Sequence, residues 1–477
     1  MKFLHNSFSR LFVCFAGVVV TITTSGHAEQ TVFSSGAHDA VGAILELSAI
    51  SHNQFTTFSH SAFPGQSTRI KKSDFCDGGV ISYTGYIDVG PRHFFFYFFE
   101  SRSDPENDDV ILWTNGGPCN VISPNSTEYN PYSWNSNANI FFIDQPIGTG
   151  FSYHDYGELL STAEDAAEEM AAFVAMFFET FSNFRGCNFH LAGESYGGRV
   201  LPIYAAAIYD LNAVLAANSL TPIKLKSIML GNGWTDVFHV FRSYYVMQCT
   251  NASLGPVQTI NTCVRMKQIL PRCESRLRTN CIEHFDRIDC MSSSNFCRVE
   301  LFDPLLALGY DYHDISRKCD TDVDCYPEHQ DIEAYLNSPS TRMELGVDPA
   351  FGRFNLMNPK LSVSFWRNGD QLHETKLYVA ELLARGVKVL VYAGSYDFIC
   401  NWIGNERWTL EMEWAGKEAF STTPLRDWLV GDEPAGKTRA SGNLTFATIQ
   451  GAGHMAPHDK PIESLEMLKR WLADEAM

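Results

Sequence analysis

The pentapeptide Gly193-Glu194-Ser195-Tyr196-Gly197, with the segments on either side of it, decides the predicted fold. The apolar run 189–193 before it is typical of a buried strand, and residues 198–217 after it have helical spacing. A serine between glycines at a turn from strand to helix is the setting of a nucleophile elbow, because glycines permit the strained turn that projects the hydroxyl. We therefore predict an α/β-hydrolase fold with Ser195 as its nucleophile. The alternative is a tight turn with an ordinary serine.

Apolar runs and helical patterns alternate along most of the chain. The predicted strands are 93–100, 110–113, 139–144, 189–193, 227–231, 388–393 and 445–450, and the predicted helices are 161–181, 198–217, 371–385 and 461–473. This alternation favours a mostly parallel central sheet between helices. Residues 236–335 interrupt it with a cysteine-rich, aromatic stretch that we interpret as an irregular, disulfide-rich cap inserted over an active site.

Two loops further along the chain supply the partners that a nucleophilic serine needs. A serine hydroxyl requires a base to take its proton, and the base requires an acid to orient it. In this fold the acid and then the histidine follow the serine. Asp397 comes directly after the strand 388–393, and His454 comes after the strand 445–450, preceded by glycines. Although a lone histidine is more often structural, both loops leave the same edge of the sheet as the elbow, so we predict a triad of Ser195, Asp397 and His454.

The N-terminus has the order of a secretory signal peptide. Lys2 and Arg10 precede an apolar run, 11–22, which is followed by polar residues and a plausible cleavage site after Ala28. The run is too short to span a bilayer comfortably. We therefore predict a signal peptide at 1–28, an N-terminal arm or propeptide at 29–75, the first part of the core at 76–235, the cap at 236–335 and the second part of the core at 336–477. The expected location is secreted or vacuolar.

Composition and charge limit the possible partners. With 45% hydrophobic and 19% charged residues, the chain is typical of a globular protein with a substantial core, which excludes a disordered or collagenous class. Its formal net charge of -19 predicts repulsion from nucleic acids and anionic membrane surfaces. We expect neither as a partner after the signal is removed.

The cysteines indicate disulfide bonds. Cys14 lies in the signal, and eight of the 13 cysteines fall between residues 249 and 325. In an exported protein this cluster favours disulfides over a metal site, because the paired spacing of zinc ligands is absent. Glycosylation sequons lie at Asn125, Asn251 and Asn443. We predict no metal and no organic cofactor.

At these residues the sequence resembles the serine carboxypeptidases. The shared blocks are GESYGG at 193–198, LGNGWTD at 230–236, DFICNW at 397–402, GHM at 453–455, YTGYIDV at 83–89, WTNGGP at 113–118 and NPYSWN at 130–135. The resemblance runs from about residue 75 to the C-terminus, with fungal vacuolar members among the nearest likenesses. It implies a hydrolase that acts on the C-termini of peptides or proteins.

The resemblance also implies roles for residues around the triad. The backbone N–H groups of Gly117 and Tyr196 would form the oxyanion hole, and Asn115, Gly116 and Glu194 would bind the substrate carboxylate. If Glu194 shares a proton with that carboxylate, acidic pH favours binding. Phe398 and Met455 would shape the substrate pocket, although packing accounts for both equally well. The implied disulfides are Cys76–Cys119, Cys249–Cys263, Cys273–Cys297, Cys281–Cys290 and Cys319–Cys325, with Cys187 and Cys400 unpaired.

The sequence departs from the family pattern after Pro118. The family continues this block with Gly-Cys-Ser-Ser and a short helix that carries a second glutamate, whereas here Cys119 follows directly. Residues 354–366 also lack the cysteine that would pair with the missing one. Either coding sequence was lost from the gene model, or the chain has diverged with loss of a whole disulfide. Because the gap begins beside Gly117, a displaced oxyanion loop would slow the reaction by about 10²-fold or more, even with every triad residue intact.

Three functions fit these observations. A serine carboxypeptidase that is favoured by acidic pH fits best. An esterase or acyltransferase on the same fold fits less well, because Asn115 and Glu194 suit a carboxylate. A catalytically impaired glycoprotein is disfavoured by the complete triad and permitted by the shortened loop.

Overall fold

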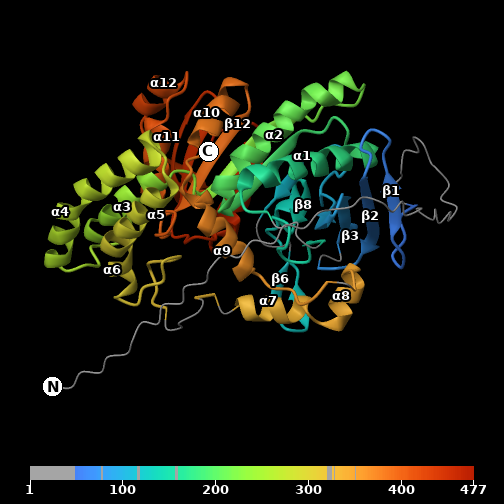
Figure 1. Ribbon diagram of the computed structural model, residues 1–477, viewed down its shortest axis with the longest axis horizontal. Coiled ribbons are helices and arrows are strands. Elements are labelled where there is room, and N and C mark those ends of the chain that lie inside the picture. The colour runs from blue at the N-terminus through green and yellow to red at the C-terminus, as the bar shows by residue number, and fades with distance from the viewer. Residues whose placement is uncertain are drawn as a thin grey trace, which may run out of the picture. The chain divides into compact units, whose positions relative to one another are not determined.

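One sheet of 13 strands organises the part of the chain that this computed structural model describes, residues 49–76, 79–114, 119–155, 160–319, 325–326, 328–349 and 351–477 (Figure 1). The strands follow the order β1-β2-β3-β4-β8-β5-β10-β11-β12-β15-β14-β13, and β9 pairs with β4. Their bounds are β1 Thr56–Ser59, β2 Gln66–Ser73, β3 Ser82–Val89, β4 Arg92–Phe99, β5 Val110–Trp113, β8 Asn139–Ile143, β9 Tyr153–His154, β10 Phe189–Ser195, β11 Leu225–Gly233, β12 Lys388–Gly394, β13 Arg426–Val430, β14 Glu433–Ser441 and β15 Leu444–Ile449. A separate pair of strands follows Cys119: β6 (Asn120–Ser123) and β7 (Ser126–Glu128).

The centre of the sheet is parallel and its flanks are antiparallel. The neighbours from β8 through β5, β10, β11 and β12 to β15 all run in the same direction. Both flanks, β1 to β4 and β14 to β13, pair antiparallel. Because the carboxyl ends of parallel strands meet at one edge, the loops after β10, β11, β12 and β15 converge there. The predicted fold class is confirmed.

Helices cover both faces of the sheet. The bounds are α1 Ala163–Thr180, α2 Gly197–Ala217, α3 Val237–Cys249, α4 Ile260–Leu277, α5 Arg287–Cys297, α6 Asp303–Leu306, α7 Glu328–Leu336, α8 Pro339–Leu345, α9 Pro359–Asn368, α10 Lys376–Ala384, α11 Trp402–Glu411, α12 Lys417–Thr422, α13 Ala456–Asp459 and α14 Pro461–Leu472. Successive side chains of a strand point to opposite faces. In β5, Val110 and Leu112 therefore enter a core with α1, α2 and α10, while Ile111 and Trp113 enter a second core with α7 and α14.

All seven predicted strands are present, with bounds shifted by no more than two residues. The helix predicted at 371–385 begins only at Lys376. Its first residues use their backbone groups elsewhere: Trp234 Nε1 donates to the Gln371 carbonyl at 2.7 Å, and Thr375 N–H donates to the Thr235 carbonyl at 2.9 Å. Strands β1 and β2 come from the segment 29–75, in which the sequence shows no strand period.

The prediction that the segment 236–335 is irregular is wrong, because its described residues form the helices α3 to α7. The helices α3 to α6 enclose a core of their own that also receives Phe398 and Ile403. Four disulfides cross-link the segment, Cys249–Cys263, Cys273–Cys297, Cys281–Cys290 and Cys319–Cys325, and Cys76–Cys119 joins β2 to β6. These pairs are those that the resemblance implies.

Within the described ranges, α2 alone is long and apolar enough to cross a membrane by length and composition. It lies on the sheet beside α1 (Figure 1) and contributes Leu201, Tyr204 and Ile208 to the core, which accounts for its apolar character. The predicted signal peptide lies outside the described residues.

Candidate active site

Ser195 lies at a strained turn between β10 and α2. Its φ angle is +57°, in the left-handed region that residues other than glycine rarely adopt. The Ser195 carbonyl accepts a hydrogen bond from Trp234 N–H at 2.8 Å, which ties the turn to the end of β11. Gly198 lies so close to this strand end that a Cβ atom would be 2.6 Å from Gly233 Cα. The turn therefore has the geometry of a nucleophile elbow.

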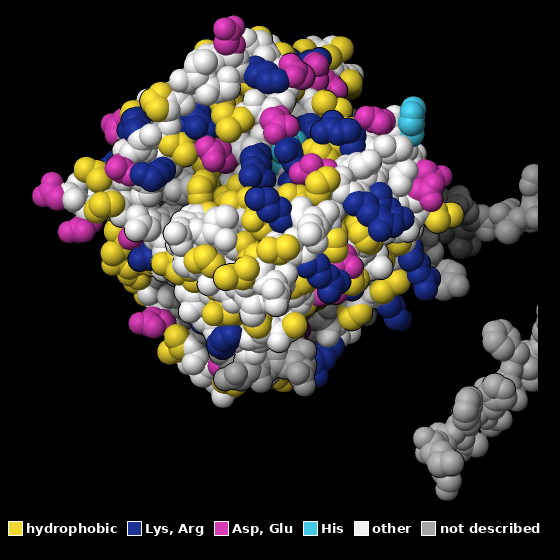
Figure 2. Space-filling model, turned by 90° about the vertical axis from the view of Figure 1, so that its left-hand side faces the viewer, with side chains coloured by type: hydrophobic (Ala, Val, Ile, Leu, Met, Phe, Trp, Pro, Cys, Tyr) yellow, Lys and Arg dark blue, Asp and Glu magenta, His cyan; other side chains and the backbone are white. Residues whose placement is uncertain are grey.

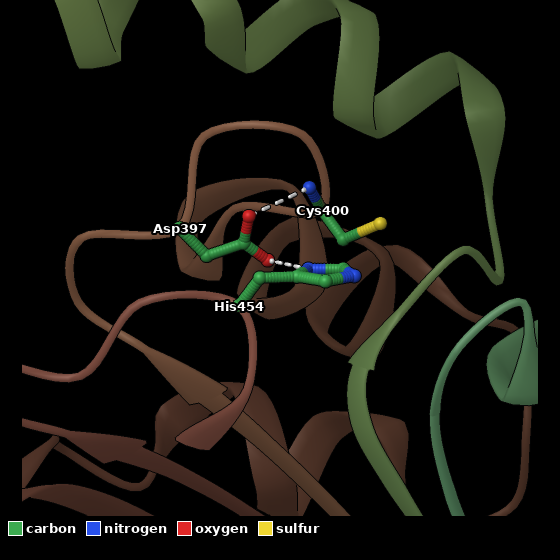
Figure 3. Close-up of side chains that lie close together, drawn as sticks. All are labelled: Asp397, Cys400 and His454. Carbon is green, nitrogen blue, oxygen red and sulfur yellow. Dashed lines mark hydrogen bonds and ion pairs between the residues drawn. The ribbon is translucent and has the colours of Figure 1, made fainter. Parts of the chain in front are cut away.

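Asp397 and His454 form a buried pair at the same edge of the sheet. Asp397 follows β12, His454 follows β15, and the distance between His454 Nδ1 and Asp397 Oδ2 is 2.9 Å. Asp397 is fully buried and His454 is 7% exposed. Figure 3 shows one Asp397 oxygen directed at the His454 ring and the other at the Cys400 backbone nitrogen, 3.3 Å away. Since Nδ1 faces the carboxylate, Nε2 is the nitrogen left to act as a base.

The amide of Asn232, at the end of β11, also holds Asp397. Asn232 Nδ2 donates to Asp397 Oδ2 at 2.6 Å, and Asn232 Oδ1 accepts from Gly394 N–H at 3.1 Å. Asn232 is fully buried and has a φ angle of +42°, which asparagine tolerates better than most residues. We predicted no role for Asn232 from the sequence. The only available signal was its place directly after a predicted strand, in the block LGNGWTD.

The surroundings of His454 favour its charged form. Burial lowers the pKa of His454, but the carboxylate of Asp397 opposes this effect, and the nearby Glu194 and Asp459 add to that opposition. The result is a pKa raised above the ordinary value of histidine. An imidazole that favours the charged form can accept a proton readily, and the adjacent carboxylate of Asp397 would stabilise the imidazolium.

Glu194, next to the elbow serine, is a buried carboxyl group. It is 6% exposed, and the Tyr392 hydroxyl donates to Glu194 Oε1 at 3.3 Å. Burial raises the pKa of Glu194 to about 8, against a smaller opposing effect from His454. At neutral pH this side chain is therefore largely a neutral acid that can donate a hydrogen bond.

Comparison with known proteins places this arrangement in a family. The sequence model of the family described as serine carboxypeptidase matches residues 77–474. The chain belongs to the serine carboxypeptidase family. It is 35% identical to carboxypeptidase Y of Candida albicans over 430 residues, which cover 86% of this chain and 77% of the relative. It is also 35% identical to the vacuolar serine-type carboxypeptidase ATG42 of Saccharomyces cerevisiae, over 90% of this chain and 87% of the relative.

A solved structure shows the same fold. The prohormone-processing carboxypeptidase Kex1(delta)p from Saccharomyces cerevisiae aligns with a TM-score of 0.69 at 22% identity, covering 83% of this chain and 92% of that chain. This protein is accordingly an enzyme, a serine-type carboxypeptidase that hydrolyses peptides.

Cys400 lies beside the pair in this serine carboxypeptidase. Its sulfur, an Asp397 oxygen and a His454 nitrogen all lie within 4.8 Å of one another, a spacing at which three groups could hold a metal ion. Burial and then the charge of Asp397 raise the pKa of the Cys400 thiol well above its ordinary value, so it stays protonated. A protonated thiol is a poor nucleophile and a poor metal ligand.

The remaining predicted residues fall into three groups. Asn115, Gly116 and Gly117 lie outside the described residues. Phe398 is fully buried, and its ring lies tilted against that of Tyr244 with the centroids 4.6 Å apart, so its side chain packs in the core of the cap. Met455 is half-buried next to His454. Of the glycosylation sequons, Asn125 and Asn251 are exposed and Asn443 is half-buried.

Proposed function

We propose that Ser195, His454 and Asp397 are the catalytic triad with which this serine carboxypeptidase releases C-terminal residues from peptides. The observation that carries the proposal is the 2.9 Å contact between His454 Nδ1 and Asp397 Oδ2, at the sheet edge where Ser195 occupies a strained elbow. A serine, a histidine and an oriented acid are the three parts of this chemistry.

The reaction proceeds through an ester on Ser195. The Ser195 oxygen bonds to the scissile carbonyl carbon while its proton passes to His454 Nε2. The tetrahedral intermediate collapses when His454 gives this proton to the leaving amino group, and the C–N bond breaks. Water then attacks the ester, His454 takes and returns a proton, and the shortened peptide leaves as a carboxylic acid. The backbone N–H groups of Tyr196 and Gly117 stabilise the oxyanion both when the ester forms and when it is hydrolysed.

Glu194 recognises the free C-terminus together with Asn115 and the Gly116 N–H. A protonated Glu194 donates a hydrogen bond to the substrate carboxylate, whereas an ionised one repels it. Because the pKa of Glu194 is about 8, recognition weakens as the pH rises through this value. The neutral form of His454, which acts as the base, is lost at low pH. The activity therefore has an acid limb set by His454 and an alkaline limb set by Glu194.

The location we propose is the secretory pathway, ending in the vacuole or outside the cell. The predicted signal peptide, the disulfides and the vacuolar name of one relative support it. The substrates are peptide or protein C-termini. The face that contains the cap helices has basic and acidic side chains interspersed (Figure 2), without the large basic field typical of a nucleic-acid surface.

The test is hydrolysis of a blocked dipeptide with a free C-terminus, compared with the same dipeptide as its amide, at pH 5, 7 and 9. The wild type should cleave the free acid faster, and Ser195→Ala should abolish cleavage. In the wild type KM for the free acid should rise about tenfold per pH unit above pH 8, and in Glu194→Gln it should no longer depend on pH.

Glu100→Gln is the matched control for the glutamate. Glu100 Oε1 also accepts from a tyrosine hydroxyl, that of Tyr83 at 2.9 Å, but it lies in another part of the sheet. This variant should keep the wild-type pH profile. Absence of serine-dependent cleavage by the folded protein contradicts the proposal, and cleavage of ester substrates alone indicates an esterase.

A further inference from the structure

A segment of five residues in the cap contacts, through different members, both the loop that carries Asp397 and the loop that carries His454. We call residues 311–315 the linking segment. The Tyr312 carbonyl accepts from the N–H groups of Phe398 and Ile399, at 3.2 and 3.1 Å, and these residues follow Asp397 directly. Ile315 N–H donates to the carbonyl of Tyr396, the residue before Asp397, at 3.0 Å. Three backbone hydrogen bonds thus fix the acid loop.

The same segment fixes the base loop. The His313 carbonyl accepts from the backbone N–H of His454 at 2.7 Å. The rings of His313 and His454 face each other, with centroids 4.9 Å apart and an interplanar angle of 34°. A Cβ atom on Gly453 would lie 2.6 Å from the His313 carbonyl oxygen, so the backbones are in direct contact. The linking segment therefore bridges Asp397 and His454 from the side of the cap.

An ion pair between the buried Asp311 carboxylate and the exposed Arg317 guanidinium closes the turn that shapes this segment. Asp311 is fully buried; its Oδ1 accepts from His313 N–H at 2.8 Å and its Oδ2 accepts from Arg317 Nε at 2.9 Å. The backbone adds a bond from Asp311 N–H to the Arg317 carbonyl, at 3.2 Å. The Arg317 guanidinium lies over the Tyr326 ring, 4.9 Å from its centroid. Among the described residues, neither Asp311 nor Arg317 forms a hydrogen bond or ion pair with Ser195, Asp397 or His454.

We propose that Asp311 and Arg317 are positioning residues for catalysis. They shape the linking segment, and this segment sets the distance and angle between the Asp397 carboxylate and the His454 ring. The inference rests on the proposed role of His454 as the base. An error of about 1 Å in such a geometry can cost about 10²-fold in rate without loss of substrate binding.

The variant that tests this is Arg317→Met, which keeps much of the side-chain length and removes the charge and the donor. In serine-dependent cleavage of the blocked dipeptide, kcat should fall about 10- to 100-fold while KM changes less than about twofold. Arg317→Lys, which retains the charge, should recover part of the loss. Arg298→Met is the matched control, because Arg298 pairs with Asp303 at 2.8 Å in the same cap but does not contact either loop. It should keep the wild-type kcat.

A second readout separates positioning from a loss of stability. The groups facing the His454 ring are Asp397, Glu194, Asp459, His313 and the Cys400 thiol. If the Asp397 contact loosens, the carboxylate stabilises the imidazolium less, and the titration of His454 moves to lower pH. The acid limb of kcat/KM in Arg317→Met should move in the same direction. In a variant that is only less stable, the acid limb of kcat/KM should stay at the pH of the wild type.

Titration of the His454 ring by NMR distinguishes failure of this inference from failure of the proposed function. A lower pKa of His454 in Arg317→Met, in an enzyme without serine-dependent activity, supports the positioning role and contradicts the proposed function. An unchanged His454 titration and an unchanged kcat in Arg317→Met overturn the inference. So does a fall in kcat that Arg298→Met reproduces.

Discussion

At the scale of single residues, Asp397 and Glu194 lie in different surroundings, which give their carboxyl groups different properties. Asp397 is contacted by the amide of Asn232, the N–H of Cys400 and the ring of His454, so its orientation is fixed by three partners. Glu194 is held by the Tyr392 hydroxyl at 3.3 Å, and burial raises its pKa to about 8. The contacts of Asp397 therefore suit the proposed orientation of His454, and the raised pKa of Glu194 suits the proposed donation of a hydrogen bond to a substrate carboxylate.

Asn232→Asp should slow catalysis without weakening substrate binding. Aspartate keeps the shape, tolerates the left-handed backbone and still accepts from Gly394 N–H, but it replaces the donor to Asp397 by a second acidic oxygen. A hydrogen bond to a charged group contributes about 1.5–3 kcal/mol, so we expect kcat to fall about 10- to 100-fold with KM unchanged. Steady-state kinetics with the blocked dipeptide measures both constants.

Asn139→Asp is the control for that substitution. Asn139 is also fully buried, and its amide donates to the carbonyls of Pro105 and Asp108, at the opposite end of the sheet strands from the triad. The substitution Asn139→Asp should lower the free energy of unfolding and leave kcat unchanged. Equal kcat values for the two variants would show that Asn232 acts only through stability.

At the scale of elements, the helices and strands that could be predicted from the sequence are those with a clear hydrophobic pattern. The central strands are continuous apolar runs, so the sequence predicted these strands and, after them, the loops that carry Ser195, Asp397 and His454. The edge strands β1 and β13 are short and mostly exposed or half-buried, and β13 begins with the charged residues Arg426 and Asp427, so neither strand is a continuous apolar run. In α4 only Met266, Cys273 and Leu277 are buried, because cystines replace part of the usual apolar stripe. The contacts of the linking segment could not be predicted from the sequence, because they depend on how the cap packs.

Gly198→Ala tests how closely α2 must approach β11 for the elbow to form. The added Cβ atom would lie 2.6 Å from both Gly233 Cα and Trp234 N, which are backbone atoms that cannot rotate away. Overpacking of this kind costs about 1–3 kcal/mol, and we expect kcat to fall as well because the turn at Ser195 is displaced. Urea unfolding and peptide hydrolysis measure the two effects. Gly352→Ala, where no heavy atom lies within 4 Å of the new Cβ, should change neither quantity.

At the scale of the whole molecule, carboxyl groups with raised pKa values link stability to pH. Burial raises the pKa of Asp144 from 3.8 to about 7 and that of Glu194 from 4.5 to about 8. A carboxyl whose pKa is higher in the folded state contributes stability that is complete below its unfolded pKa and is lost as the pH rises through its folded pKa. The raised pKa values of His454 and His458 act in the same direction, while the lowered pKa values of His190 and His373 oppose it.

The free energy of unfolding should therefore be larger at pH 5 than at pH 8, by about 2–5 kcal/mol from the two carboxyl groups. Asp144 is partly buried beneath the turn at Gly150, and its Oδ2 accepts from Phe151 N–H at 2.7 Å. The asparagine side chain in Asp144→Asn does not titrate, so this variant should reduce the difference in unfolding free energy between pH 5 and pH 8 by about 1–3 kcal/mol.

Asp88→Asn is the control, because the salt bridge to Arg69 and the contact with His93 outweigh burial and lower the pKa of Asp88 below its ordinary 3.8. A lowered pKa contributes stability that is already complete at pH 5, so this variant should lose the same amount at both pH values and leave the difference unchanged. Urea unfolding of the oxidised protein at the two pH values gives each quantity. Equal stability of the wild type at pH 5 and pH 8 contradicts this prediction, and greater stability at pH 5 that Asp144→Asn reduces and Asp88→Asn does not would assign the pH dependence to the buried carboxyl groups.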